Sequence, residues 1–145
     1  MVVGTRVELG DGDDIAEIAH YTGGDINGGA GFDTVVLTGG ANALSGNHLS
    51  GIEAVDLGSS ERDTPNVISL TTADLLENHD DNGNLWITGQ AGDKVALWEG
   101  AVKSDEVVQT ADGEIFHEYS YTVDNTTYSV LINDELYQNG LGVVI

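Results

Sequence analysis

Short apolar runs, separated by glycine, asparagine and aspartate, make up most of this chain. The runs are rich in valine, isoleucine and leucine, a pattern typical of β-strands bounded by turns. We expect such strands at residues 35–37, 52–57, 67–70, 85–88, 95–97, 119–123, 128–132 and 142–145. Within residues 52–57 the apolar and acidic positions alternate imperfectly, as expected for a partly covered sheet.

Helical periodicity is scarce. One short helix is predicted at residues 72–78, because Thr71 or Thr72 can cap its amino end and Asp74 places a negative charge in its first turn. Residues 16–21 fit a helix or a strand equally well. Residues 80–84 are predicted to form a turn, since they lack the glycine and the distal glutamate of an EF-hand loop.

The last third of the chain predicts an antiparallel hairpin. A polar stretch at residues 124–127 separates two runs that carry Tyr119, Tyr121, Tyr128 and Val130 as expected cross-strand neighbours. The apolar residues 141–145 fit either a final strand or the tail of an export signal.

Composition narrows the class of protein. The 145 residues hold 4 Lys and Arg against 25 Asp and Glu, a formal net charge of −21. Nucleic-acid binding and docking on an anionic membrane are therefore not expected, because both depend on basic side chains. No apolar run approaches the ~20 residues that span a bilayer, and we find no signal peptide. Cysteine is absent, which excludes disulfides and thiolate metal sites.

The glycine-rich turns carry the most specific motif. Residues 28–36, Gly-Gly-Ala-Gly-Phe-Asp-Thr-Val-Val, match the nonapeptide G-G-x-G-x-D-x-U-x at every fixed position, where U is apolar. Residues 9–17 fit the same frame, with Leu9 in place of the first glycine and Ala16 at U. Glycine allows tight turns in which carbonyl oxygens approach one point, and the aspartate of the frame would turn its carboxylate toward that point.

Three carboxylates within four residues at positions 11–14 repel one another unless a cation lies among them. Ca²⁺ prefers carboxylate and carbonyl oxygens, so the sequence predicts calcium turns. The candidate ligands are Asp11, Asp13, Asp14, Asp25, Asn27 and Asp33. Two metal-free alternatives stay open: the turns serve backbone geometry alone, or the acidity is that of a salt-adapted protein.

From these turns onward the chain resembles the RTX-type repeat regions of large bacterial adhesins exported by type I secretion. Residues 28–37 carry the nonapeptide, and residues 51–57 resemble the G-I-E-x-I-D-L strand of such regions. Residues 66–76 resemble their N-x-L-x-L-x-x-x-D-V-L segment, and residues 85–97 their L-x-I-x-G-x-A-G-D-x-V-x-L segment. The resemblance spans about residues 9–145. It implies a secreted β module that stays unfolded for export and folds outside the cell when calcium binds.

We therefore expect a single all-β domain with one short helix. Residues 1–40 would form calcium-binding turns of a parallel β-roll, residues 41–100 solenoid-like strands, and residues 101–145 closing antiparallel strands. The expected function is non-enzymatic: a calcium-binding structural or adhesive module at the bacterial cell surface. Its expected partners are calcium and the neighbouring domains of a larger chain.

Two alternatives for the function stay open. The first is a module that binds a carbohydrate or a peptide, such as a cell-surface glycan or a protein receptor, with Trp98 at a strand end as the candidate stacking residue. The second is the accessory portion of an exported polysaccharide-active enzyme. The four histidines are scattered and form no motif for a transition metal, and no G-x-S-x-G nucleophile motif is present.

Overall fold

The computed structural model describes residues 2–3, 6–58, 65–137 and 142–145, and its fold is mostly β, as predicted. The strands are β1 (Val2–Val3), β2 (Val7–Glu8), β3 (Ile15–Ile18), β4 (His20–Tyr21), β5 (Ile26–Asn27), β6 (Thr34–Leu37), β7 (Ala43–Ser45), β8 (Leu49–Ser50), β9 (Ala54–Asp56), β10 (Val67–Ser69), β11 (Asn84–Thr88), β12 (Lys94–Ala96), β13 (Val102–Gln109), β14 (Ile115–Val123), β15 (Thr126–Asn133) and β16 (Val143–Val144). The helices are the 3₁₀ turn η1 (Gly46–His48), α1 (Thr72–Glu77) and α2 (Asp134–Tyr137).

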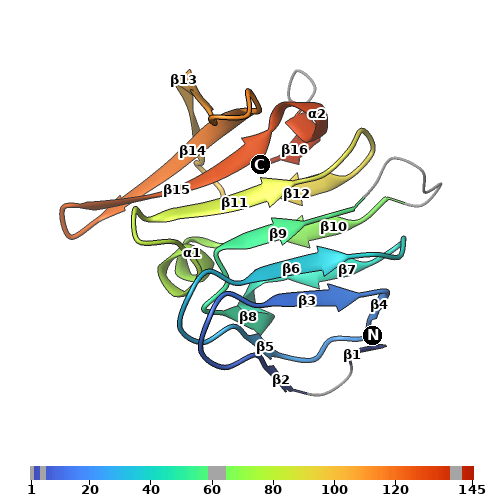
Figure 1. The fold of residues 1–145 in the computed structure, drawn as a ribbon. Helices are drawn as coiled ribbons and strands as arrows, with labels where there is room; N and C mark the ends of the chain where they lie inside the picture. Colours follow the sequence, from blue (N-terminus) through green and yellow to red (C-terminus); the bar gives the residue numbers. More distant parts are fainter. Residues whose placement is uncertain (1, 4–5, 59–64, 138–141) are drawn as a thin grey trace.

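Parallel pairing dominates the sheets (Figure 1). In the largest sheet, β3, β6, β9, β11 and β15 are parallel neighbours, and β14 and β13 continue it in antiparallel pairs. A second sheet, in the order β16-β12-β10-β7, is parallel throughout. A third holds β2, β5 and β8, again parallel, and β1 pairs with β4.

The chain visits these sheets in turn, and we call each excursion that ends on a strand of the largest sheet a pass. The first five passes end on β3, β6, β9, β11 and β15. Each strand therefore pairs with its equivalent in the next pass, as when Ile15 aligns with Thr34 and Thr34 with Ala54. In the fourth pass α1 takes the place of a strand beside β8, and the Gly51 N–H donates to the Glu77 carbonyl at 2.9 Å.

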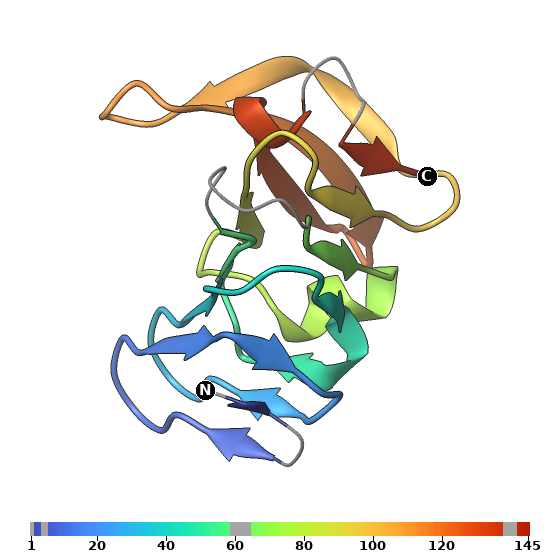
Figure 2. The ribbon, with the colours of Figure 1, turned by 90° about the vertical axis from the view of Figure 1, so that its right-hand side faces the viewer.

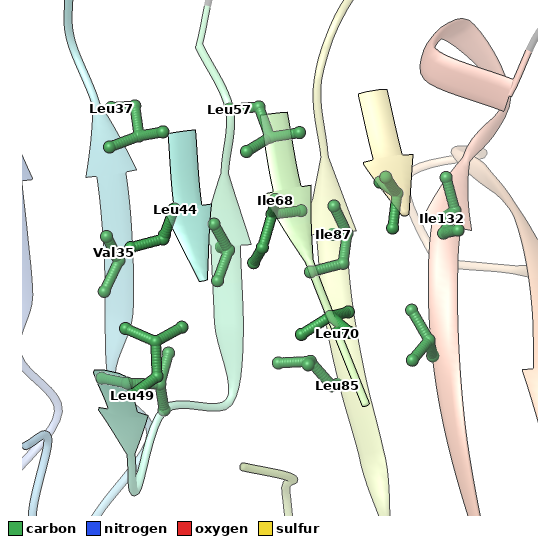
Figure 3. Close-up of a cluster of buried hydrophobic side chains, with 14 of the residues drawn as sticks. Val35, Leu37, Leu44, Leu49, Leu57, Ile68, Leu70, Leu85, Ile87 and Ile132 are labelled. Carbon is green, nitrogen blue, oxygen red and sulfur yellow. The ribbon is translucent and has the colours of Figure 1, made fainter. Parts of the chain in front are cut away.

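The hydrophobic core lies between the largest sheet and the second sheet (Figure 3). Val35, Leu37 and Leu57 point from β6 and the end of β9 toward Leu44 and Ile68 on β7 and β10. All five are at most 2% exposed. Each buried side chain of this size contributes about 1.5–3 kcal/mol relative to an exposed one, so this interface holds the passes together.

The predicted helix is present as α1, one residue shorter than expected. It begins with a capping box, in which the Thr71 hydroxyl accepts from the Asp74 N–H and the Asp74 carboxylate accepts from the Thr71 N–H at 2.7 Å. Leu75 on this helix is fully buried. The expectation of a single helix was wrong, because α2 follows β15 directly. Residues 16–21, left open as helix or strand, form the end of β3 and then β4.

The predicted hairpin is β14 and β15, with Tyr121 opposite Tyr128 and Tyr119 opposite Val130. Asp124 and Asn125 in its turn have positive φ values of 50° and 64°, which aspartate and asparagine tolerate better than most residues. The antiparallel strands predicted in residues 101–145 are present as β13, β14 and β15, but parallel pairing there was not predicted. β15 also pairs in parallel with β11, and β16 with β12.

Figure 2 shows the two ends of the molecule along the succession of passes. The first passes lie at one end, and the strands β13, β14 and β15 lie at the other. Strand β13 was not predicted, because polar residues fill its centre and most of its side chains are exposed. No helix in the described ranges has the length and apolar character to cross a bilayer.

Candidate metal centre

The two glycine turns that match the nonapeptide frame lie one above the other. β3 follows the first turn and β6 follows the second, and these strands are parallel neighbours with Ile15 beside Thr34. The Thr34 N–H donates to the Asp14 carbonyl at 2.9 Å, which fixes the register of the two turns. As the frame predicts, Ala16 and Val35 at the apolar positions are buried.

Close approach of the two turns explains the glycines. A Cβ at Gly29 would lie 2.3 Å from the Gly10 carbonyl oxygen, and a Cβ at Gly31 would lie 2.3 Å from the Gly12 carbonyl oxygen. Both positions also have positive φ, 84° and 108°, a conformation that glycine adopts at little cost. The carbonyls of the first turn therefore face the second turn directly.

Acidic side chains link the turns in what we call the carboxylate ladder: Asp14, Asp33 and Glu53. The Asp14 N–H donates to Asp33 Oδ1 at 2.9 Å, and the Asp33 N–H donates to Glu53 Oε1 at 2.5 Å. Each residue immediately precedes a strand of the largest sheet, so the ladder runs along the starts of β3, β6 and β9. Beside it, the Phe32 N–H donates to Asp13 Oδ1 at 2.8 Å.

Asp33 and Glu53 of the ladder are buried and Asp14 is half-buried, and two of their carboxylate oxygens have no hydrogen-bond partner among the described residues. Asp33 is fully buried and Glu53 is 6% exposed. Asp33 Oδ2 and Asp14 Oδ2 are both inaccessible to solvent and accept no hydrogen bond from the part of the chain that the structure describes. Removing a carboxylate oxygen from water without giving it a partner is costly, so these two oxygens call for a proton or a cation.

Burial has the expected electrostatic effect. It raises the pKa of the Asp33 carboxyl against the lowering effect of the Asp14 N–H, and the charges of Asp14 and Asp13 raise it further. Burial likewise raises the pKa of Glu53 to about 7, against the Asp33 N–H, while the charge of Asp33 adds to the increase. At neutral pH Glu53 is therefore partly protonated, and a nearby cation would favour release of that proton.

A cleft of about 420 Å³ opens beside Glu53. Asp13, Phe32 and the loop of residues 79–82 line it together with Glu53. The loop is held by Asp80, whose Oδ1 accepts from the N–H groups of Asn82 and Asn84 and whose Oδ2 accepts from Trp86 Nε1 at 2.9 Å. The prediction of a turn at residues 80–84 is thus confirmed.

A second ladder, which we call the amide ladder, runs through Tyr21, Asn42, Asn66 and Asp93. Asn42 Oδ1 accepts from the Tyr21 N–H at 2.8 Å, Asn66 Oδ1 from the Asn42 N–H at 2.7 Å, and Asp93 Oδ1 from the Asn66 N–H at 2.8 Å. Asp93 Oδ2 accepts from the Gln90 N–H at 3.0 Å. Asp93 therefore closes a turn with both oxygens bonded.

Of the six predicted ligands, the structure brings Asp13, Asp14 and Asp33 together at the stacked turns. Asp11 is exposed in the first turn. Asn27 leads into the second turn, where its Oδ1 accepts from the Gly29 N–H at 3.1 Å. Asp25 does not join the ladder's hydrogen bonds, because it lies just before β5 and its Oδ1 contacts Nδ1 of His48, in η1, at 2.7 Å.

Glu53 was missed as a site residue, because the imperfect alternation of residues 52–57 suggested an ordinary strand position. A signal was available. Gly12-Asp13-Asp14, Gly31-Phe32-Asp33 and Gly51-Ile52-Glu53 share the spacing glycine, any residue, acid, and each is followed by a strand of the largest sheet.

The donor set suits a hard cation. Within the described ranges, no three His, Asp or Glu side chains are grouped so that they could hold a metal by themselves. A cation at the turns would therefore need backbone carbonyls as well as the Asp14 and Asp33 carboxylates. Mixed carboxylate and carbonyl oxygens are the ligands that Ca²⁺ takes, so the residues present fit calcium.

Trp98, the candidate stacking residue, is half-buried and packs against the core. Its ring lies 6.5 Å from that of Tyr121 in an edge-on arrangement. This packing gives Trp98 a structural role, and ligand stacking by it stays a prediction. Comparisons with family models, curated proteins and solved structures found no match to this chain.

Proposed function

We propose that this chain is a calcium-binding structural module of a secreted bacterial RTX-type adhesin. Calcium joins the first two glycine turns and makes folding depend on the metal. In this proposal the successive parallel passes are the coils of a calcium β-roll, and the β13–β14–β15 sheet closes one end. The role is non-enzymatic and is exerted outside the cell, next to other domains of a larger protein.

The observation that carries the proposal is the pair of buried, unpartnered oxygens, Asp14 Oδ2 and Asp33 Oδ2, in adjacent turns. The Gly10 and Gly12 carbonyls face Gly29 and Gly31 of the second turn. A divalent cation there would satisfy both carboxylates and offset part of the self-repulsion of a chain of charge −21. A metal-free turn would leave these oxygens to protons alone.

Calcium-linked folding follows from the same geometry. The ligands belong to separate passes, so they converge only when β3 has paired with β6. Binding energy is then folding energy. At a calcium concentration about 100-fold above Kd the gain is about 2.7 kcal/mol, which corresponds to about 5–10 °C in Tm for a chain of this size.

The test is thermal unfolding of the full chain, followed by far-UV circular dichroism in EDTA, in CaCl₂, and in MgCl₂ at equal ionic strength. We expect calcium to raise Tm by about 5–10 °C or more and magnesium to have little effect. Calorimetric titration should give heat of binding for calcium at the same concentrations. An identical spectrum and Tm in EDTA and calcium would overturn the proposal.

Two variants locate the effect. Asp33→Asn keeps the oxygen that accepts from the Asp14 N–H but removes the charge, so we expect the calcium response to disappear. Asp93→Asn is the matched control, because Asp93 is equally buried but both of its oxygens already have backbone partners. It should keep the full calcium response even though its basal stability changes.

A further inference from the structure

The first pass leaves one side of its backbone unpaired. β3 is an end strand of the largest sheet and pairs with β6 alone. The carbonyls of Asp14 and Ile18 accept from the N–H groups of β6 and its extension. Because backbone groups alternate sides along a strand, Ile15 and Glu17 turn their N–H and C=O groups to the side that no described strand occupies.

β2 is open on the same side. The N–H groups of Val7 and Leu9 donate to the carbonyls of Asp25 and Asn27, so Glu8 between them faces away from β5. We call this surface, formed by β2, β3 and the Asp14 carboxylate, the upstream edge. The far end of the largest sheet is different, because β15 is covered there by the antiparallel strands β14 and β13 (Figure 1).

The carboxylate ladder indicates that, within the described part of the chain, a backbone N–H donor to the Asp14 carboxylate is missing at the upstream edge. Within the ladder, each acid accepts an N–H from the preceding pass: Asp33 from Asp14, and Glu53 from Asp33. The amide ladder follows the same rule, as when Asn66 accepts from Asn42. Asp14 is the first acid of its ladder, and among the described residues no N–H donates to its carboxylate.

Side-chain exposure agrees with an incomplete stack. Ile15 points outward from β3 and is 65% exposed. Thr34, at the equivalent place on β6, is less exposed than Ile15: it is half-buried, because a strand flanks β6 on each side. Val36 on β6 is half-buried as well. A strand added beside β3 would cover the open flank of Ile15 in the same way.

We propose that the upstream edge is a docking surface for a further glycine–aspartate pass, which adds in parallel to β3 and places a backbone N–H on the Asp14 carboxylate. The register between the first two passes, continued by one step, supplies the geometry. A second copy of this chain fits less well. Two equivalent β3 edges that continue one sheet would pair antiparallel about a twofold axis, so the start of each β3 would lie opposite the end of the other and the parallel register of the ladder would not continue.

The proposal rests on strand register and on the ladder rule, and it does not require calcium. Docking is nevertheless measured at saturating calcium, and calcium binding by the chain alone is measured separately. Loss of docking with intact calcium binding would count against the edge, and loss of calcium binding would count against the metal site.

The probe is a fluorescent peptide with the sequence of residues 22–40 of this chain, which contains β5, the complete nonapeptide and β6. We expect saturable binding to the full chain, and none with a scrambled peptide. Hydrogen exchange should slow by about 10-fold or more at the Ile15 and Glu17 amides, whose N–H groups face the open side. The Ala16 amide, which faces β6, should change little.

Glu17→Pro removes an N–H that the docked pass would use, and proline is tolerated on an edge strand whose N–H is free. It should weaken binding by about 10-fold or more, while the matched Glu17→Ala retains affinity. Should the proline variant fail to fold, the exchange measurement on the unaltered chain decides. Unchanged exchange at Ile15 and Glu17, or equal binding by Glu17→Pro, would overturn the proposal. So would concentration-dependent protection of these amides without peptide, which would identify a second copy as the occupant.

Discussion

The amide ladder and the carboxylate ladder both connect successive passes of the chain, but they do so with different side-chain chemistry. Each joins successive passes by a side chain that accepts a backbone N–H. In the amide ladder, Asn66 also donates from Nδ2 to the carbonyls of Gly39 and Leu57, both at 2.8 Å. In the carboxylate ladder, Asp33 keeps a second buried oxygen that no described residue satisfies.

This difference separates a structural hydrogen-bond ladder from a candidate cation site. An amide has donors and acceptors, so a buried asparagine can be completed by backbone alone. An ionised carboxylate only accepts, so a buried carboxylate oxygen that no N–H or O–H group reaches needs a proton or a cation. Burial of a polar side chain alone therefore does not identify the candidate site. The site is identified by a buried polar group whose hydrogen-bonding capacity the fold does not satisfy.

The largest effect is expected from breaking the amide ladder. Asn66→Ala removes one acceptor and two donated hydrogen bonds from a fully buried position. At about 1–3 kcal/mol for each group left unsatisfied, the free energy of unfolding should fall by about 4 kcal/mol. Because this ladder needs no cation, the loss should be the same in calcium and in EDTA, as measured by urea unfolding.

Ser45→Ala, on the neighbouring strand β7, is the control for Asn66→Ala. The Ser45 hydroxyl donates to Asn47 Oδ1 in an exposed hydrogen bond, so the change should cost less than about 0.5 kcal/mol. A calcium-dependent loss in Asn66→Ala would show that the two ladders are coupled, against the comparison drawn here.

The next effect is a pH dependence confined to the carboxylate ladder. The pKa of Glu53 is raised from 4.5 to about 7 in the folded state, so the folded chain binds this proton more tightly than the unfolded chain. Stability in EDTA should therefore be greatest below about pH 4.5 as far as this group is concerned, and should fall as pH rises to about 7. The fall is about 3 kcal/mol at 1.36 kcal/mol for each pKa unit.

Glu53→Gln should flatten this profile, since glutamine keeps an oxygen for the Asp33 N–H and does not titrate. The exposed Glu17→Gln should leave it unchanged. Asp33 has a raised pKa as well and contributes with the same sign. A profile in EDTA that rises between pH 4.5 and 7, or one that Glu53→Gln does not alter, would contradict the assignment of a protonated Glu53.

Local patterns allowed much of the fold to be predicted. The apolar runs at residues 67–70 and 85–88 correspond to β10 and β11, and Thr71 with Asp74 caps α1 as expected. The parallel pairing of β15 with β11 was not predicted, because it joins segments about 45 residues apart and depends on the core that both strands share. No local pattern carries that information.

The site was predicted in part for the same reason. The nonapeptide marks Asp33, and its imperfect copy marks Asp14, since the frame encodes a turn and the strand after it. Glu53 follows no complete frame, and its role appears only when its strand pairs with β6. Asp25 was included because it follows two glycines, yet those glycines lead toward the third sheet.

The smallest effect is expected at Asp25. Its side chain is 67% exposed and that of His48 is 36% exposed, and ion pairs at such positions are worth about 0–1 kcal/mol. Asp25→Asn should change the free energy of unfolding by less than about 0.5 kcal/mol, and calcium titration should give the same affinity as the unaltered chain. Asp33→Asn, in contrast, should abolish the response. If Asp25→Asn weakened calcium binding as strongly as Asp33→Asn, the cation site would extend to the third sheet, and the boundary drawn between ladder acids and surface acids would be misplaced.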